Sequence, residues 1–264
     1  MPRPMPDFTL LPIAHRGLHD LQAGVVENSL SAIDAAAANG YAVEIDVQLS
    51  ADGEAMVFHD DVLDRLTDRT GPVGALTRAQ LQHVELRGGG GDRIPSLAQA
   101  LRVLAGRTPI VVEIKRQPGP SGPLEEAVAR ALARYSGPAA VMSFDPRPIA
   151  WFRDNAPEVR RGLVSCSFAE VDDAADVLDE RQRQALADLE LFDELEADFV
   201  SYGVRDLPRP AVAALRARGA PVLCWTVRNE ADAAEALRHA DAITFEGFRP
   251  PVAAVARGAR AGRA

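Results

Sequence analysis

The sequence contains few of the features that assign a protein to a class at first sight. Only two cysteines occur among its 264 residues, Cys166 and Cys224, and neither belongs to a CxxC motif or lies near paired histidines. This usage favours reduced core thiols over a disulfide or a thiolate metal site, and it suits a cytoplasmic protein.

Membrane, export and nucleic-acid features are also missing. No apolar run approaches the ~18 residues that a membrane span needs, and the N-terminus carries no secretion signal. Acidic residues outnumber basic ones, 38 to 29, and the net charge of -9 argues against a nucleic-acid partner. We therefore expect a cytoplasmic protein without stable membrane insertion, and a homo-oligomer stays open. An anionic substrate is not excluded, because a metal or local arginines can reverse the field at one site.

Alternating secondary structure is what the sequence does contain. Short β-branched runs recur along the chain, with alanine- and leucine-rich helical stretches between most of them. The runs are LLPIAH, AVEIDV, PIVVEIK, AAVMSF, RGLVS, ADFVSY, PVLCWTV and DAITF. Eight strand–helix units in roughly 250 residues match a (β/α)8 barrel better than an open doubly wound sheet. The predicted fold class is therefore α/β, a TIM barrel with a small insertion after its second strand.

We expect a single domain over residues 1–264, with its core at about 10–250 and the insertion at about 50–95. The insertion holds a hairpin-like stretch, a small helix and a glycine-rich loop at 88–91. That loop lacks the preceding strand and the following lysine of a phosphate loop, so we interpret it as a surface loop. The other long connection includes the acidic segment 169–196, which is most simply a solvated helix, with a partner surface as the alternative.

Local signals mark the ends of two predicted helices. Ser96 and Gln99 form a predicted capping box, and Gly106 is expected to end that helix. Asp145 is a predicted N-cap, followed by Pro146 at the first helical position.

The stretch EIDVQLS at 44–50 places two carboxylates on one face of the second predicted strand. Glu44 and Asp46 share that face because residues two apart on a strand point the same way. The apolar residues between them must meet the outer helices, so both carboxylates point inward, and EIK repeats the arrangement with Glu113 and Lys115. Three converging carboxylates with few cations nearby favour a divalent cation, and oxygen ligands favour Mg²⁺ or Ca²⁺ over zinc.

Histidines follow two of the predicted strands. His15 and Arg16 end the first strand, and His59 follows the hairpin after the second. Two imidazoles that flank a metal suggest acid–base chemistry on a phosphate ester, because an imidazole group can both accept and donate a proton. The metal and Arg16 would neutralise the phosphoryl oxygens as charge builds. No serine or cysteine is placed as a nucleophile beside a base, which disfavours covalent acyl chemistry.

A series of short motifs, taken in order, resembles the glycerophosphodiester phosphodiesterases over nearly the whole chain. The motifs are HRG at 15, EN at 27, EIDV at 44, HDD at 59, EIK at 113, SFD at 143 and WTV at 225. The resemblance implies a metal-dependent TIM-barrel enzyme. Such an enzyme hydrolyses glycerophosphodiesters, such as glycerophosphocholine or glycerophosphoethanolamine, to glycerol 3-phosphate and an alcohol.

The resemblance also implies a role for each matching residue. His15 and His59 correspond to the acid–base pair. One divalent cation, Mg²⁺ or Ca²⁺, would be held by Glu44, Asp46 and Glu113. The implied substrate-binding residues are Arg16, Glu27, Asn28, Lys115, Phe144 and Trp225, the last two on the glycerol side. Family members are thought to use the neighbouring glycerol hydroxyl for attack, giving a cyclic phosphate that water opens, so no protein nucleophile is needed.

Three positions, at two places in the chain, depart from the family pattern. Family members often have Asn after Trp-Thr-Val, where this chain has Arg228, and a Thr-Asp pair where this chain has Phe245 and Glu246. These departures bear on substrate preference more than on the reaction. Arg228 either adds a cation for an anionic head group or lies exposed at the surface.

Two other functions are weighed against this one. A phospholipase-D-type hydrolase of lysophospholipid head groups also has a barrel, two histidines and an E-x-D strand. The sequence lacks the disulfide pair and the amphipathic membrane surface that would favour it. A non-catalytic binder of phosphate ligands would keep the pocket, but it would not need both histidines and all three carboxylates.

Overall fold

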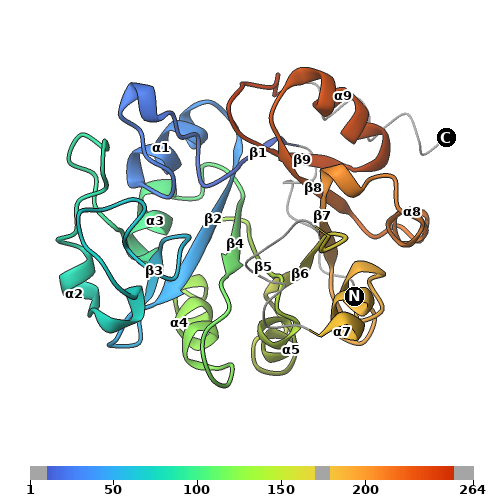
Figure 1. Ribbon diagram of the computed structural model, residues 1–264, viewed down its shortest axis with the longest axis horizontal. Coiled ribbons are helices and arrows are strands. Elements are labelled where there is room, and N and C mark those ends of the chain that lie inside the picture. Colours follow the sequence, from blue (N-terminus) through green and yellow to red (C-terminus); the bar gives the residue numbers. More distant parts are fainter. Residues whose placement is uncertain (1–10, 170–178, 253–264) are drawn as a thin grey trace. The chain divides into compact units, whose positions relative to one another are not determined.

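The computed structural model describes residues 11–169 and 179–252 (Figure 1). The contacts among these residues divide them into two compact units. The N-terminal unit is Ile13–Val141. The C-terminal unit comprises the described residues 142–169 and 179–252, together with residues 11 and 12.

The N-terminal unit is built around strand β2, Ala42–Leu49. Strands β1, Ile13–Ala14, and β4, Ile110–Ile114, each pair with β2 in parallel. The short strand β3, Ala55–Val57, turns back and pairs with the end of β2 in antiparallel register. The remaining elements are η2 Leu21–Ala23, α1 Leu30–Ala38, η3 Val73–Ala75, α2 Arg78–Leu81, α3 Leu97–Leu104 and α4 Pro123–Leu132, and β5 Ala139–Ser143 begins at the end of the unit.

Side-chain alternation along β2 separates the core from the polar groups. Val43, Ile45 and Val47 are all fully buried. Helix α1 packs against β2 and against α3, so this apolar face is covered (Figure 1). The alternate residues of the strand, Glu44 and Asp46, therefore take the other face, as the period of two requires.

The insertion after β2 has a hydrophobic cluster of its own. Phe58, Leu63, Leu81 and Ile94 are among its buried members, and Leu66 packs against them from the edge. The cluster joins segments that have little regular structure, so it holds the loops between β3 and α3 in place.

The C-terminal unit contains a run of parallel strands separated by helices. Strands β6, β7, β8 and β9 pair in that order, each parallel to the next. Helix α9 packs on β8 and β9 (Figure 1). The elements are α5 Pro146–Asn155, β6 Arg160–Ser165, α7 Glu180–Ala187, β7 Phe199–Gly203, η4 Val204–Asp206, α8 Pro210–Ala217, β8 Val222–Val227, α9 Glu230–His239 and β9 Ala242–Phe245.

The predicted elements are present where the sequence places them. All eight predicted strands occur among the described residues, as β1, β2 and β4–β9. The Ser96–Gln99 capping box and the Asp145 N-cap are confirmed. The helix after Ser96 ends at Leu104, and Ala105 is its C-cap in a left-handed conformation. Gly106, which was expected to end the helix, therefore follows the C-cap by one residue.

Three further expectations concern the acidic segment, the cysteines and membrane-spanning helices. The acidic segment 169–196 contains α7, but residues 170–178 lie outside the described residues. Both cysteines are buried and carry no disulfide, as expected for core thiols. Among the helices of the described ranges, none combines the length and the apolar character needed to cross a bilayer.

Candidate active site

Three buried carboxylates meet where β2 and β4 run side by side. The parallel register sets Asp46 opposite Glu113, and Glu44 lies two residues earlier on the same face of β2. Glu44 and Asp46 are each 1% exposed and Glu113 is 8% exposed. One oxygen from each of the three lies within 4.8 Å of the others. The inward convergence predicted from the strand pattern is thus present.

Glu44 is the carboxylate of the cluster with a buried oxygen that lacks a hydrogen-bond donor in the described part of the chain. Its Oε2 accepts a hydrogen bond of 2.8 Å from the backbone N–H of Arg16, while Oε1 is buried without a hydrogen-bond partner among the described residues. Burial, together with the negative charges of Asp46 and Glu113, raises the pKa of Glu44 well above its usual value. A buried carboxylate oxygen without a donor is costly in protein alone and is suited to a hard cation. The donor set therefore fits the divalent cation that the sequence implies.

Lys115 provides the positive charge inside this cluster. Its Nζ lies 2.8 Å from Asp46 Oδ1 and 2.5 Å from Glu113 Oε1. Burial alone would lower the pKa of Lys115, but the two carboxylates outweigh it and raise the pKa above the usual value. In the same way, burial opposes the charge on Asp46, but Lys115 and other cations hold its pKa well below the usual range. Asp46 and Lys115 are therefore a charged pair at neutral pH.

Asn28 serves Asp46 directly. Its Nδ2 donates to Asp46 Oδ2 at 2.9 Å, and its Oδ1 accepts from the Asp46 backbone N–H at 3.2 Å. The side chain is 1% exposed and the backbone adopts a left-handed φ of 59°. This pair of hydrogen bonds fixes the orientation of Asp46. The sequence pattern did not predict this role for Asn28.

Arg16 connects the carboxylates to the loop after β1. Its Nη1 donates to Glu27 Oε1 at 2.6 Å and its Nε lies 3.4 Å from Asp46 Oδ2. Burial alone would raise the pKa of Glu27, but hydrogen bonding from Arg65 and the charge of Arg16 lower it to about 2. Glu27 is thus an ionised anchor for the guanidinium group of Arg16.

A tight turn places His15 and Arg16 directly after β1. Arg16 and Gly17 both have left-handed backbones, with φ of 53° and 78°. Gly17 donates its N–H to Glu44 O at 3.1 Å, which ties the turn to β2. A Cβ on Gly17 would lie 2.8 Å from the backbone of Ala32 on α1, so the turn also needs the missing side chain.

Gly17→Ala is expected to destabilise the fold by about 2–4 kcal/mol, from backbone strain and the contact with Ala32. Urea unfolding followed by circular dichroism measures this loss. Gly53→Ala is the matched control, because Gly53 has the same φ of 78° but no atom of the described part of the chain lies within 4 Å of the added Cβ. Equal losses in the two variants would contradict the role of the Ala32 contact.

His59 is held by an acidic neighbour and by the strand beneath it. Its Nδ1 lies 2.7 Å from Asp60 Oδ1, and its side chain is 21% exposed. Gln48, on the same face as the carboxylates, donates from Nε2 to His59 O at 3.0 Å and to Asp61 Oδ1 at 3.0 Å. The backbone at His59 is therefore fastened to β2. His15 is half-buried at the end of β1.

The remaining predicted residues, Phe144 and Trp225, belong to the C-terminal unit and come together there. Their rings are 5.2 Å apart in an edge-to-face arrangement, and Phe168 packs on Phe144 at 6.4 Å. Trp225 donates from Nε1 to Ser201 O at 3.1 Å, which fixes the indole against β7. Both rings are only partly buried.

Two of the three residues that depart from the family pattern, Arg228 and Glu246, pair with each other. Arg228 Nη2 lies 2.6 Å from Glu246 Oε1, and the arginine side chain is 57% exposed. Phe245 is buried at 1% exposure. Arg228 is thus an exposed arginine whose charge is matched by Glu246.

Sequence reasoning did not single out three residues of this region: Gln48 as a backbone anchor, Asp60 and Arg65. Asp60 stands inside the HDD motif, and a carboxylate next to a histidine is a signal that could have found it. Arg65 lies outside every motif used, so no spacing rule points to it.

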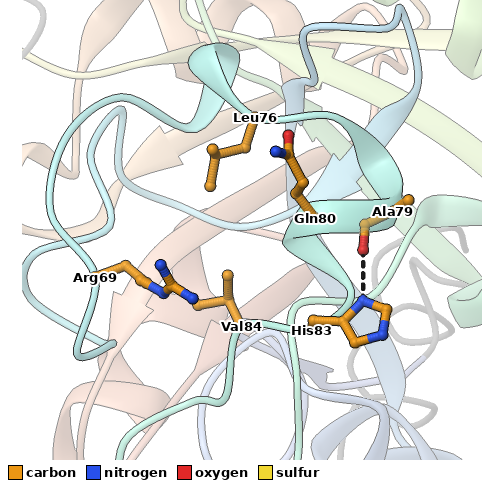
Figure 2. A pocket seen from close by; sticks show the side chains of 6 residues that line it. All are labelled: Arg69, Leu76, Ala79, Gln80, His83 and Val84. Carbon is orange, nitrogen blue, oxygen red and sulfur yellow. Dashed lines mark hydrogen bonds between the residues drawn. The ribbon is translucent and has the colours of Figure 1, made fainter.

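A separate pocket of about 470 Å³ lies within the insertion (Figure 2). His83 lies at its rim with Nδ1 2.7 Å from Ala79 O. The lining residues are Arg69, Leu76, Ala79, Gln80, His83 and Val84, and none of them belongs to the predicted site.

Known proteins share this architecture. A phosphodiesterase of Oleispira antarctica, solved in complex with the product sn-glycerol-3-phosphate, superimposes with a TM-score of 0.75 over 90% of this chain and 94% of its own, at 25% identity. A glycerophosphodiester phosphodiesterase of Caldanaerobacter subterraneus is 30% identical over 174 residues, 61% of this chain and 69% of that protein. YhdW of Bacillus subtilis, assigned as a glycerophosphodiester phosphodiesterase, is 28% identical over 232 residues, which are 84% of this chain and 88% of that protein.

Fold and site together define a barrel enzyme of the α/β class. The fold class is the TIM (β/α)8 barrel that the sequence predicts, with a small insertion after its second strand. The model of the glycerophosphoryl diester phosphodiesterase family matches residues 15–244. The chain belongs to this family, which makes it a phosphoric diester hydrolase.

Proposed function

We propose that this enzyme hydrolyses glycerophosphodiesters, such as glycerophosphocholine or glycerophosphoethanolamine, to glycerol 3-phosphate and an alcohol. The observation that carries the proposal is the buried carboxylate cluster of Glu44, Asp46 and Glu113, with one donorless oxygen. The cytoplasmic location and the single-domain organisation belong to the same proposal and rest on the sequence alone.

Glu44, Asp46 and Glu113 would hold one divalent cation. All three ligands are oxygens, which suits Mg²⁺ or Ca²⁺ better than softer metals. When bound, the cation supplies positive charge for the phosphoryl oxygens. Arg16 and Lys115 add fixed positive charge in the same cluster and orient the phosphate before reaction.

His15 and His59 would move the protons. One imidazole accepts the proton of the attacking glycerol hydroxyl, and the other donates a proton to the leaving alcohol oxygen. The P–O bond to the alcohol breaks as the ring P–O bond of a cyclic phosphate forms. Water then forms a P–O bond and loses a proton to the second imidazole, while the ring P–O bond to the former attacking oxygen breaks and the first imidazole returns its proton to that oxygen, giving glycerol 3-phosphate. The Asp60 contact at Nδ1 leaves Nε2 of His59 for proton transfer.

Phe144 and Trp225 are proposed to contact the glycerol side of the substrate. Their edge-to-face packing and the Trp225–Ser201 hydrogen bond keep the rings rigid. Arg228 is proposed to contribute little net attraction for an anionic head group, because Glu246 offsets its charge.

Incubation of the purified protein with glycerophosphocholine, with and without EDTA, tests the proposal. We expect choline and glycerol 3-phosphate without the chelator, and at least a hundredfold slower release with it, because cation removal leaves phosphoryl charge uncompensated. Mg²⁺ or Ca²⁺ added in excess should restore the rate. Release that survives EDTA would contradict the metal requirement, and phosphocholine as product would contradict the bond assignment. Faster turnover of lysophosphatidylcholine would indicate a phospholipase-D-type enzyme instead.

A further inference from the structure

One arginine of the insertion holds two carboxylates of the candidate site at once. Arg65 donates from Nε and Nη2 to the two oxygens of Asp60 at 2.7 and 2.9 Å. It also donates from Nη1 and Nη2 to the two oxygens of Glu27 at 3.0 and 2.8 Å. Each contact is a two-pronged fork, the arrangement that gives arginine–carboxylate pairs their geometric specificity.

Both carboxylates lead to residues of the proposed chemistry. Asp60 contacts the imidazole of His59, and Glu27 contacts the guanidinium group of Arg16. Glu27 belongs to the loop after β1 and Asp60 to the loop after β3, so Arg65 joins two loops that are far apart in sequence. The side chains of Glu27 and Asp60 are 15% and 19% exposed, so both carboxylates are largely shielded from water.

The backbone around Arg65 is anchored on both sides. Leu63 is buried in the cluster of the insertion, and Leu66 packs against the same cluster. Arg87 donates from Nη1 to the carbonyl oxygen of Arg65 at 3.0 Å. An exposed ion pair on a mobile chain contributes little to stability. Arg65 differs because its main chain is held by buried groups, although its own side chain is 46% exposed.

We propose that Arg65 is a positioning residue, through which the insertion holds His59 and Arg16 in fixed relation to each other. The inference rests on the proposed function, since it assumes that His59 transfers a proton and that Arg16 binds the phosphate. It gives the insertion a task in the reaction, because its hydrophobic cluster sets the place of Arg65. Asp60 then orients the imidazole, and Glu27 orients the guanidinium group of Arg16.

Steady-state kinetics with glycerophosphocholine and Mg²⁺ test this role. Arg65→Gln is expected to lower kcat/KM by about 10- to 100-fold, with a fall in kcat from misplaced His59 and a rise in KM from loosened Arg16. Arg65→Lys keeps the charge but cannot form two forks, so it should recover only a small part. Arg93→Gln is the matched control, because Arg93 is a similarly exposed arginine of the insertion that, within residues 11–169 and 179–252, forms an ion pair with Glu85 alone, at 3.1 Å.

A merely structural Arg65 would behave differently. It would lower the urea midpoint but leave kcat and KM of the folded fraction within twofold of the wild type, and that result overturns the proposal. Should Arg65→Gln fail to fold, Arg65→Lys carries the same comparison at constant charge. In the double variant Arg65→Gln with Asp60→Asn, the loss in kcat should match that of the slower single variant. Fully additive losses would overturn the route through Asp60.

The wild type and His59→Ala in the same assay separate this inference from the proposed function. An inactive wild type, or full activity in His59→Ala, overturns the proposed function and the role of Arg65 with it. An active wild type, an inactive His59→Ala and an unaltered Arg65→Gln overturn the role of Arg65 alone.

Discussion

His59→Ala and His15→Ala are each expected to lower kcat for glycerophosphocholine by about 10²–10⁴-fold, the usual contribution of a positioned acid or base. KM should change little, because Arg16, the proposed phosphate contact, is held by Glu27 and by its backbone hydrogen bond to Glu44. The double variant should be no more than slightly slower than the poorer single variant, since loss of either proton transfer already stalls the reaction. A coupled assay for glycerol 3-phosphate measures all three.

His83→Ala is the control for these substitutions. His83 is an exposed histidine of the insertion whose ring contacts Ala79 O, and it belongs to no part of the proposed chemistry. Its kinetics should equal those of the wild type. Near-normal kcat in either His15→Ala or His59→Ala would remove that histidine from the acid–base pair. A substrate with a better leaving group, such as a p-nitrophenyl ester, should suffer least from loss of the histidine that acts as the acid.

Glu44→Gln is expected to abolish metal-dependent activity while stabilising the metal-free protein. The amide oxygen can still accept the hydrogen bond from the Arg16 backbone, and the amide N–H groups replace a negative charge beside two other carboxylates. The pKa of Glu44 is raised by burial and by Asp46 and Glu113. When a carboxyl group has a higher pKa in the folded protein than in the unfolded chain, the folded protein loses stability as the pH rises above the pKa of the unfolded chain. The substitution therefore removes a destabilising charge at pH 7.

Thermal unfolding in EDTA and in saturating Mg²⁺ or Ca²⁺ measures both effects. Each kcal/mol gained should raise Tm by about 2–4 °C in a chain of this size. In the wild type, cation at 100 times its Kd should add about 2.7 kcal/mol, and in Glu44→Gln this increment should vanish. Glu54→Gln, at a partly exposed glutamate directly before β3, controls for the chemical change. A Glu44→Gln protein that still gains Tm from the cation would exclude Glu44 as a ligand.

The carboxylate cluster could be predicted from the sequence because it depends on the two-residue alternation of side chains along a strand and on the parallel register of two strands. Glu44 and Asp46 share a face by the period of two, and the parallel register then sets Glu113 beside Asp46. The strands were found for the same reason, since each is a short apolar run between helical stretches. No long-range information is needed for either inference once the barrel is assumed.

The contacts of the loops could not be predicted in this way. The tie from Glu27 through Arg65 to Asp60 depends on where two loops and the insertion come to lie, and local sequence patterns do not report that. The use of Asn28 on Asp46 depends on a left-handed backbone that only the folded turn imposes. The Arg228–Glu246 pair joins residues after neighbouring strands, and charge alone did not distinguish a paired arginine from an unpaired one.

Lys115 supplies positive charge to the carboxylate cluster independently of any bound metal. Because its ammonium group bridges Asp46 and Glu113, the pocket carries a permanent internal counter-ion from the chain itself. The charge of the proposed divalent ion would then be needed chiefly at Glu44, the carboxylate with a donorless oxygen. We therefore expect the metal-free protein to stay folded and to regain activity when the cation is supplied.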